Sequence, residues 1–185
     1  MIDVAQDAPN TIFLTEDEAS LYLQASTSYV WFPKGQTPIV RADPGRANTH
    51  FYGTLNLQTG EEIAMCSDLM NSEVSALHLE MILEANPDVP ILLFWDRAPW
   101  HRGMAIDKVL ENNPRLEIIR FPPGCPELNP QEHVWKAIRR AVSHNHIEAK
   151  LPELAKRFLD KLNASSFKSS FLQQYGYTEL CTNFI

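Results

Sequence analysis

The feature of this sequence that most restricts its fold is a short, entirely apolar run, Ile91–Trp95, which lies between Pro90 and Asp96. A strand with no polar position has no side that suits water, so we expect it in the middle of a sheet covered on both faces. The run is also far too short to cross a bilayer, which takes about 20 apolar residues. These features predict an α/β domain with no membrane partner.

Strand patterns come early in the chain, and helix patterns alternate with strands later. From period-two alternation and β-rich runs we expect strands over Thr11–Thr15, Tyr29–Phe32, Asn48–Gln58, Glu62–Cys66 and Leu116–Phe121. From apolar residues three and four apart we expect helices over Ser72–Ala85, Met104–Leu110, Asn129–Val142 and Leu151–Leu162. Early antiparallel strands followed by strand–helix alternation predict a mixed five-stranded sheet with helices on both faces.

Three acids stand where the predicted elements begin or end: Asp17 just after the first strand, Asp96 just after the apolar strand and Glu132 in the first turn of a helix. In open α/β sheets, ligand sites lie at the carboxyl ends of strands. If the two strands are parallel neighbours, both aspartates converge there, and Glu132 reaches the same place from the side. Converging carboxylates hold hard divalent cations, and two such ions can drive in-line attack at phosphate. The sequence therefore predicts a metal-dependent domain that cuts nucleic-acid strands.

Two of these acids also fit purely structural roles. Asp96 could cap its own loop through backbone N–H groups. Asn129 and Glu132 have the spacing of a helix capping box. The run Glu16-Asp17-Glu18 leaves a further choice open, because alternation along a strand puts Asp17 on one face and its two neighbours on the other.

The net charge of −7 disfavours a simple nucleic-acid-binding protein. The charge is unevenly distributed, however: residues 1–96 carry 3 basic and 14 acidic side chains, and residues 97–185 carry 13 basic and 9 acidic ones. The acidic half suits a metal site, and the basic half could face phosphates. Within the basic half, Lys136, Arg139 and Arg140 form a helical stripe that is either a solvated face or a DNA contact.

Two histidines, His101 and His133, closely follow candidate ligands, and each either orients a ligand, binds phosphate or has no functional role. The cysteines Cys66, Cys125 and Cys181 are odd in number and widely spaced, which indicates a reducing compartment and no disulfide framework. The first residues lack the basic and apolar regions of a secretory signal. We therefore expect a cytoplasmic protein.

Two motifs resemble the catalytic core of mariner-type transposases, and most closely that of their bacterial insertion-sequence relatives. They are Asp-Arg-Ala-Pro-Trp-His at residues 96–101 and Phe-Pro-Pro-Gly-Cys-Pro-Glu-Leu-Asn-Pro-Gln-Glu-His-Val-Trp-Lys at residues 121–136. Residues 15–18 and 31–38 also fit, so the resemblance extends from about Thr11 to Val142. It implies a ribonuclease H-like fold and a DDE-type triad of Asp17, Asp96 and Glu132 that binds two Mg²⁺ or Mn²⁺ ions.

The resemblance implies a transposase catalytic domain that cleaves DNA at transposon ends and joins the freed 3′-hydroxyl to target DNA. The family usually has Asn directly after the second acid, where this chain has Arg97, which either crowds the metals or contacts DNA. Two alternatives remain open. One is a catalytically decayed or co-opted remnant that only binds DNA or a protein. The other is a ribonuclease H-like nuclease that acts on other nucleic acids.

The same resemblance carries expectations about organisation and partners. The family normally has N-terminal helix-turn-helix segments, whereas this chain begins almost at the first catalytic strand, so we expect a separate DNA-binding segment or subunit, with a homodimer as an open option. We expect an N-terminal extension at residues 1–10, the catalytic domain at 11–164 and a C-terminal tail at 165–185. The partner is DNA, at the nucleoid, and the expected contacts are Arg97, His101, Lys136, Arg139 and Arg140.

Overall fold

The computed structural model describes residues 10–25, 29, 31–37, 39 and 46–167. Within them the strands are β1 (Ile12–Tyr22), β2 (Asn48–Asn56), β3 (Glu62–Ser67), β4 (Ile91–Trp95) and β5 (Leu116–Arg120), and the α-helices are α2 (Ser72–Ala85), α3 (Met104–Asn112), α4 (Gln131–Ile138) and α5 (Leu151–Asn163). The strands form one sheet in the order β3-β2-β1-β4-β5. β1 pairs antiparallel with β2 and parallel with β4. The predicted mixed five-stranded sheet is confirmed.

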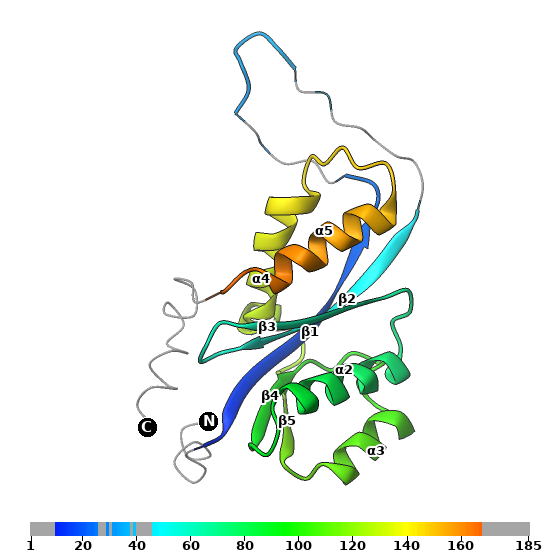
Figure 1. Ribbon diagram of the computed structural model, residues 1–185, viewed down its shortest axis with the longest axis vertical. Helices are drawn as coiled ribbons and strands as arrows, with labels where there is room; N and C mark the ends of the chain where they lie inside the picture. Colours follow the sequence, from blue (N-terminus) through cyan, green and yellow to red (C-terminus); the bar gives the residue numbers. More distant parts are fainter. Residues whose placement is uncertain (1–9, 26–28, 30, 38, 40–45, 168–185) are drawn as a thin grey trace.

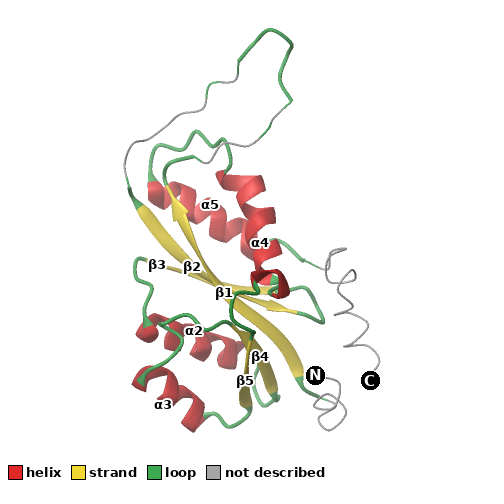
Figure 2. Ribbon diagram, turned by 180° about the vertical axis from the view of Figure 1, so that it is seen from behind, coloured by secondary structure: helices red, strands yellow, loops and turns green. Residues whose placement is uncertain are grey.

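Helices cover both faces of this sheet, with α4 and α5 on one side and α2 and α3 on the other (Figures 1 and 2). Successive residues of β1 enter the two layers in turn, so Phe13 packs with α4 and α5 while Leu14 packs with α2 and α3. All of β4 is buried, as its apolar sequence predicted. No helix in the described part of the chain is both long and apolar enough to cross a membrane.

β1 is longer than predicted, and this changes the position of Asp17. The strand was expected to end at the run of acids, but it continues to Tyr22 because β2 pairs with it along that whole length. The parallel pairing with β4 stops earlier, at Thr15 opposite Phe94. The prediction that Asp17 ends the first strand is therefore wrong: Asp17 lies inside β1, beyond the end of β4, where the same register continued would set it opposite Asp96.

The strand predicted over Tyr29–Phe32 does not form. Tyr29, Trp31 and Phe32 have no regular secondary structure, and Tyr29 and Trp31 are fully exposed. Val30 lies outside the described residues, as do residues 1–9 of the predicted extension and 168–185 of the predicted tail. The propensity of this segment for β-structure was real, but a strand forms only where a neighbour completes its hydrogen bonds and covers a face.

The helices begin and end close to their predicted positions. α2 starts at Ser72 as predicted, and the side chain of Asn71 caps it by accepting a hydrogen bond from the N–H of Val74 at 2.9 Å. α4 is shorter than expected, since it starts at Gln131 and passes into a π-helical segment after Ile138.

Candidate active site

One cavity of about 380 Å³ contains all three acids that the sequence singled out. Asp17 enters it from β1, Asp96 from the turn after β4 and Glu132 from the first turn of α4. Arg97 and the segment Phe121–Pro126 line the rest of it, together with Ala98 and Asn129. The structure thus brings to one place three carboxylates that lie far apart in the sequence.

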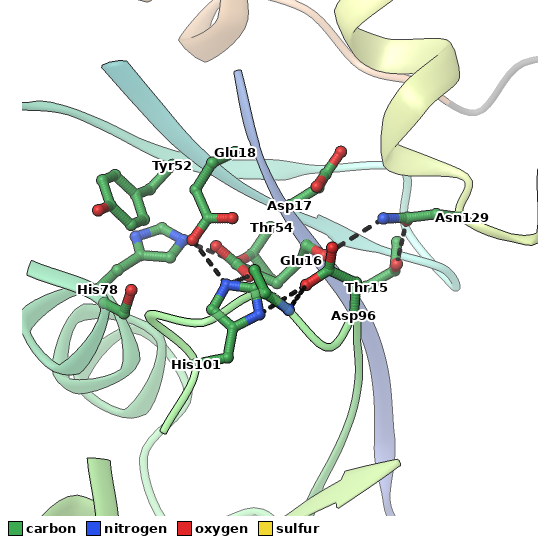
Figure 3. A network of polar contacts seen from close by, with 12 residues as sticks. Thr15, Glu16, Asp17, Glu18, Tyr52, Thr54, His78, Asp96, His101 and Asn129 are labelled. Carbon is green, nitrogen blue, oxygen red and sulfur yellow. Dashed lines mark hydrogen bonds and ion pairs between the residues drawn. The ribbon is translucent and has the colours of Figure 1, made fainter. Parts of the chain in front are cut away.

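The alternation of β1 settles which of its three acids enters this cavity. Asp17 lies on the α4 side of the sheet, where Nε1 of Trp135 donates a hydrogen bond to its Oδ2 at 3.2 Å. Glu16 and Glu18 point to the opposite side, toward His101 (Figure 3). The sequence left open that Glu16 or Glu18 is the third acid instead of Asp17. Neither can enter the cavity, because both side chains lie on the other face of the sheet.

The ionisation of Asp17 shows that the acids of the cavity interact. Burial raises the pKa of Asp17 to about 8, with further contributions from the negative charges of Glu132, Glu18 and Asp96. A cation bound nearby would offset the free-energy cost of ionising the buried Asp17. Hard carboxylate oxygens are the ligands that Mg²⁺ and Mn²⁺ prefer, so the three acids of this cavity fit such an ion.

His101 contacts the carboxylate of Asp96 (Figure 3). Nδ1 of His101 lies 2.7 Å from Oδ1 of Asp96, and its Nε2 lies 2.8 Å from Oε1 of Glu18. The backbone N–H of Ala98 also donates to Oδ1 of Asp96, at 2.8 Å, so the loop-capping role coexists with the place in the cavity. Burial alone would raise the pKa of Asp96, but the hydrogen bonds from His101 and Ala98 lower it below its ordinary value.

The environment of His101 argues against the DNA contact predicted for it. Its side chain is only 1% exposed, and its ring stacks on that of Trp95 with 4.0 Å between centroids. Burial alone would lower the pKa of His101, but the hydrogen bonds to Asp96 and Glu18 raise it above its ordinary value. The ring lies between two carboxylates that favour its charged form, and its burial keeps it from the surface that DNA could contact.

Arg120 is a member of this site that the sequence did not reveal. Its Nη1 donates to the carbonyl of Asp96 at 2.8 Å and its Nη2 to the carbonyl of His101 at 2.7 Å. Its guanidinium also lies 4.7 Å from the centroid of the Trp95 ring. Arg120 ends β5 directly opposite Trp95, and this parallel register between β4 and β5 is visible only in the fold.

A compact acidic cluster lies behind the cavity, on the α2 side of β1. Ligand atoms of Glu16, Glu18 and His101 lie within 4.8 Å of one another, which among the described residues is closer than the three acids of the cavity come. Glu16 is fully buried, and its pKa is raised well above the ordinary value by burial and then by the charges of Glu18 and Asp17. This cluster is separate from the three acids of the cavity, because Glu16 and Glu18 lie on the other face of β1 from Asp17.

The start of α4 is tied to β1 through Asn129. Its Oδ1 accepts hydrogen bonds from Oγ1 of Thr15 at 2.7 Å and from the N–H of Gln131 at 3.1 Å, and its Nδ2 lies 3.4 Å from the carbonyl of Glu16. Thr15 and Asn129 are both buried. These bonds place the first turn of α4, and with it Glu132, beside the strand that carries Asp17.

Three of the four predicted basic residues, Arg97, Lys136 and Arg139, line two adjoining cavities. Nε of Arg97 donates to the carbonyl of Phe121 at 2.9 Å, which holds this side chain at the wall of the cavity. Lys136 and Arg139 line a second cavity of about 330 Å³, which shares Glu132 with the first. The other residues of its lining are His133 and His144. Arg140 is exposed and belongs to neither lining.

Comparison with known proteins identifies the family and the fold of this chain. Residues 13–155 match the family described as the DDE superfamily endonuclease. The insertion element IS630 uncharacterized 39 kDa protein of Shigella sonnei is 25% identical over 147 residues, which make up 77% of this chain and 42% of that protein. The chain therefore spans less than half the length of this relative.

Solved structures with a similar fold come from the Mos1 transposase. A pre-cleavage Mos1 transpososome matches with a TM-score of 0.68 at 13% identity, over 99% of this chain and 58% of the other. The catalytic domain of Mos1 mariner transposase matches with a TM-score of 0.59 at 15% identity, over 93% of this chain and 78% of the other. At these identities the likeness concerns the fold, and it confirms the ribonuclease H-like arrangement expected from the sequence.

Proposed function

Because the chain belongs to the DDE superfamily of endonucleases, we propose that it carries out metal-dependent DNA strand cleavage and strand transfer at transposon ends. One observation carries the proposal: Asp17, Asp96 and Glu132, from three separate elements, line a single cavity. Family and fold support a transposase-type catalytic domain, and the acids are the groups in this cavity that suit the chemistry.

In this proposal Asp17, Asp96 and Glu132 are the ligands of two Mg²⁺ or Mn²⁺ ions. Such ions, when bound, activate the attacking oxygen and stabilise the leaving oxygen of an in-line displacement at phosphorus. The protein itself holds the ligands in place: Trp135 orients Asp17, and His101 and Ala98 orient Asp96. Both bonds to Asp96 end on Oδ1, so they leave Oδ2 for an ion.

The DNA would approach over the basic side of the cavity. Lys136 and Arg139 line the cavity that adjoins Glu132, and Arg97 lines the cavity of the acids, so these three can contact phosphates on either side of the cleaved bond. Arg140 is exposed next to them and adds positive charge. We propose transposon ends and target DNA as the substrates, in the cytoplasm at the nucleoid, with a separate DNA-binding segment or subunit supplying sequence recognition.

A catalytically decayed, DNA-binding remnant is the second candidate, and Arg97 favours it because a guanidinium lines the same cavity as the acids. The bond from Arg97 to the carbonyl of Phe121 favours activity, since it anchors the side chain at the wall. A transposase cuts DNA strands, whereas a remnant only binds them. A ribonuclease H-like nuclease would instead cut RNA–DNA hybrids.

The test is nicking of supercoiled plasmid in Mn²⁺, with an RNA–DNA hybrid as a parallel substrate. We expect the wild-type chain to nick plasmid, Asp96→Asn to be inactive, and the matched control Asp107→Asn, on the exposed side of α3, to retain wild-type activity. A wild-type chain that binds DNA without nicking it would establish the remnant. Cleavage confined to the hybrid would establish the nuclease.

A further inference from the structure

Gly53 marks a place where α4 approaches the sheet unusually closely. It lies on β2, opposite Asp17 of β1. A Cβ atom added at Gly53 would come within 2.5 Å of Nε2 of Gln131, Oε1 of Glu62 and Cη2 of Trp135, a separation that real Cβ atoms do not show. Side chains of opposed residues in a sheet stand on the same face, so the space that Gly53 leaves open adjoins Asp17.

Two of the three side chains over Gly53 form a buried polar pair. Nε2 of Gln131 donates a hydrogen bond to Oε1 of Glu62, the first residue of β3. The remaining oxygen of each group, Oε2 of Glu62 and Oε1 of Gln131, is buried without a hydrogen-bond partner. Two acceptor oxygens cannot satisfy each other, and leaving both unpaired in the interior is costly.

A single proton on Glu62 would give both of these oxygens a hydrogen-bond partner. A carboxylic acid and a primary amide can form a cyclic pair, in which the amide N–H donates to one carboxyl oxygen and the carboxyl O–H donates to the amide oxygen. Gln131 supplies no charge to balance an ionised carboxylate, and a buried carboxylate without a counter-charge takes up a proton. In agreement, burial raises the pKa of Glu62 to about 8, although the hydrogen bond from Gln131 partly opposes this.

We propose that Glu62 and Gln131 form a carboxylic acid–amide pair that seats the first turn of α4 on Gly53 and so positions Glu132 beside Asp17. Gln131 directly precedes Glu132, and Trp135, one turn later, covers Gly53 and binds Asp17. Asn129 tethers the same turn to β1, whereas the pair tethers it to β3. Glu62 and Gln131 are thus positioning residues, and this role rests on the proposed metal-binding function of Glu132.

The pair itself is tested by carboxyl ¹³C NMR on the metal-free protein across pH. The signal assigned to Glu62, identified by its loss in Glu62→Gln, should remain that of a protonated acid at neutral pH and titrate well above the ordinary range of a glutamate. A Glu62 signal that titrates in the ordinary acidic range would overturn the acid–amide pair.

The positioning role is tested by Mn²⁺ titration and metal-free melts of the same variants. Glu62→Gln should bind Mn²⁺ nearly as well as wild type, because two amides also form a two-bonded pair. Gln131→Leu should fold with a cooperative melt but bind Mn²⁺ on the order of 10-fold more weakly, the usual effect of losing an outer support of a metal ligand. Glu61→Gln, at the exposed neighbour of Glu62, is the matched control.

Three outcomes separate the possibilities. A Gln131→Leu variant that binds Mn²⁺ like wild type overturns the positioning role. A Glu62→Gln variant that loses as much affinity as Gln131→Leu overturns the explanation by pairing. A wild-type chain that binds no Mn²⁺ overturns the proposed function and the positioning role with it, while the NMR titration still decides whether the pair exists.

Discussion

Nδ1 of the buried His101 lies 2.7 Å from Oδ1 of Asp96. A side chain inaccessible to DNA thus holds a carboxylate that opens into the cavity, with Glu18 as the second acceptor of the same ring. The arrangement matches the outer support that metal-binding carboxylates commonly have. Two contacts to the same oxygen, from His101 and from the N–H of Ala98, thus orient Asp96.

The first prediction concerns His101→Phe, which keeps a ring against Trp95 but removes both hydrogen bonds. Glu18 then remains buried without its cation, and the loss of one partner of a buried ion pair costs about 3–5 kcal/mol. We also expect Mn²⁺ affinity to fall by roughly 10–100-fold, because Asp96 is no longer oriented. Thermal melts and Mn²⁺ titrations measure both effects, with Arg102→Ala at the exposed neighbour as control. Unchanged Mn²⁺ affinity would show that Asp96 needs no such support.

The second prediction concerns the stability of Asp17→Asn without metal. The pKa of Asp17 is raised in the folded state to about 8, so the wild-type protein loses stability as the pH rises from about 4 to about 8, where the unfolded chain releases the proton more readily. Asp17→Asn lacks this loss and should melt at a higher temperature than wild type at pH 7. Melts over this pH range test the prediction, and two curves with the same pH dependence would contradict it.

The third prediction concerns Asp96→Asn, for which we expect the melting temperature at pH 7 to fall, whereas it should rise for Asp17→Asn. The pKa of Asp96 is lowered in the folded state, so its charge stabilises the fold above its unfolded pKa, and that stability is lost as the pH falls through the folded pKa. Asp96→Asn should therefore melt somewhat below wild type at pH 7, with the difference vanishing in acid. The contact with His101 gives this sign, since repulsion among the acids alone would make the Asn variant as stable as the wild type or slightly more stable.

The fourth prediction concerns DNA binding by the isolated chain. With a net charge of −7 we expect weak binding with little sequence preference that falls steeply with salt. Lys136→Ala should weaken binding to all sequences alike and reduce the salt slope by about 1. Lys156→Ala, on the exposed side of α5, should change neither. Tight, sequence-specific binding by the wild-type chain at physiological salt would contradict the prediction.

The local features of this protein were predictable from its sequence because each depends on a few neighbouring residues. The apolar run of β4 predicted a buried central strand, and the apolar spacing over Ser72–Ala85 predicted α2. The strand predicted at Tyr29–Phe32 failed because propensity acts only when a partner strand is present. Asp96 and Glu132 were recognisable in the same way, from the strand that one follows and the helix that the other begins, whereas Asp17 lies inside β1 and not at its end.

The sequence by itself determined the element types, the mixed sheet and the identity of Asp17, Asp96 and Glu132 as candidates. Only the tertiary structure decided how they are held. The continuation of β1 past the acids, the burial of His101, the bonds of Arg120 and the pair over Gly53 all join residues distant in sequence. Such contacts follow from strand register and layer packing, which many residues set together, so no local pattern encodes them.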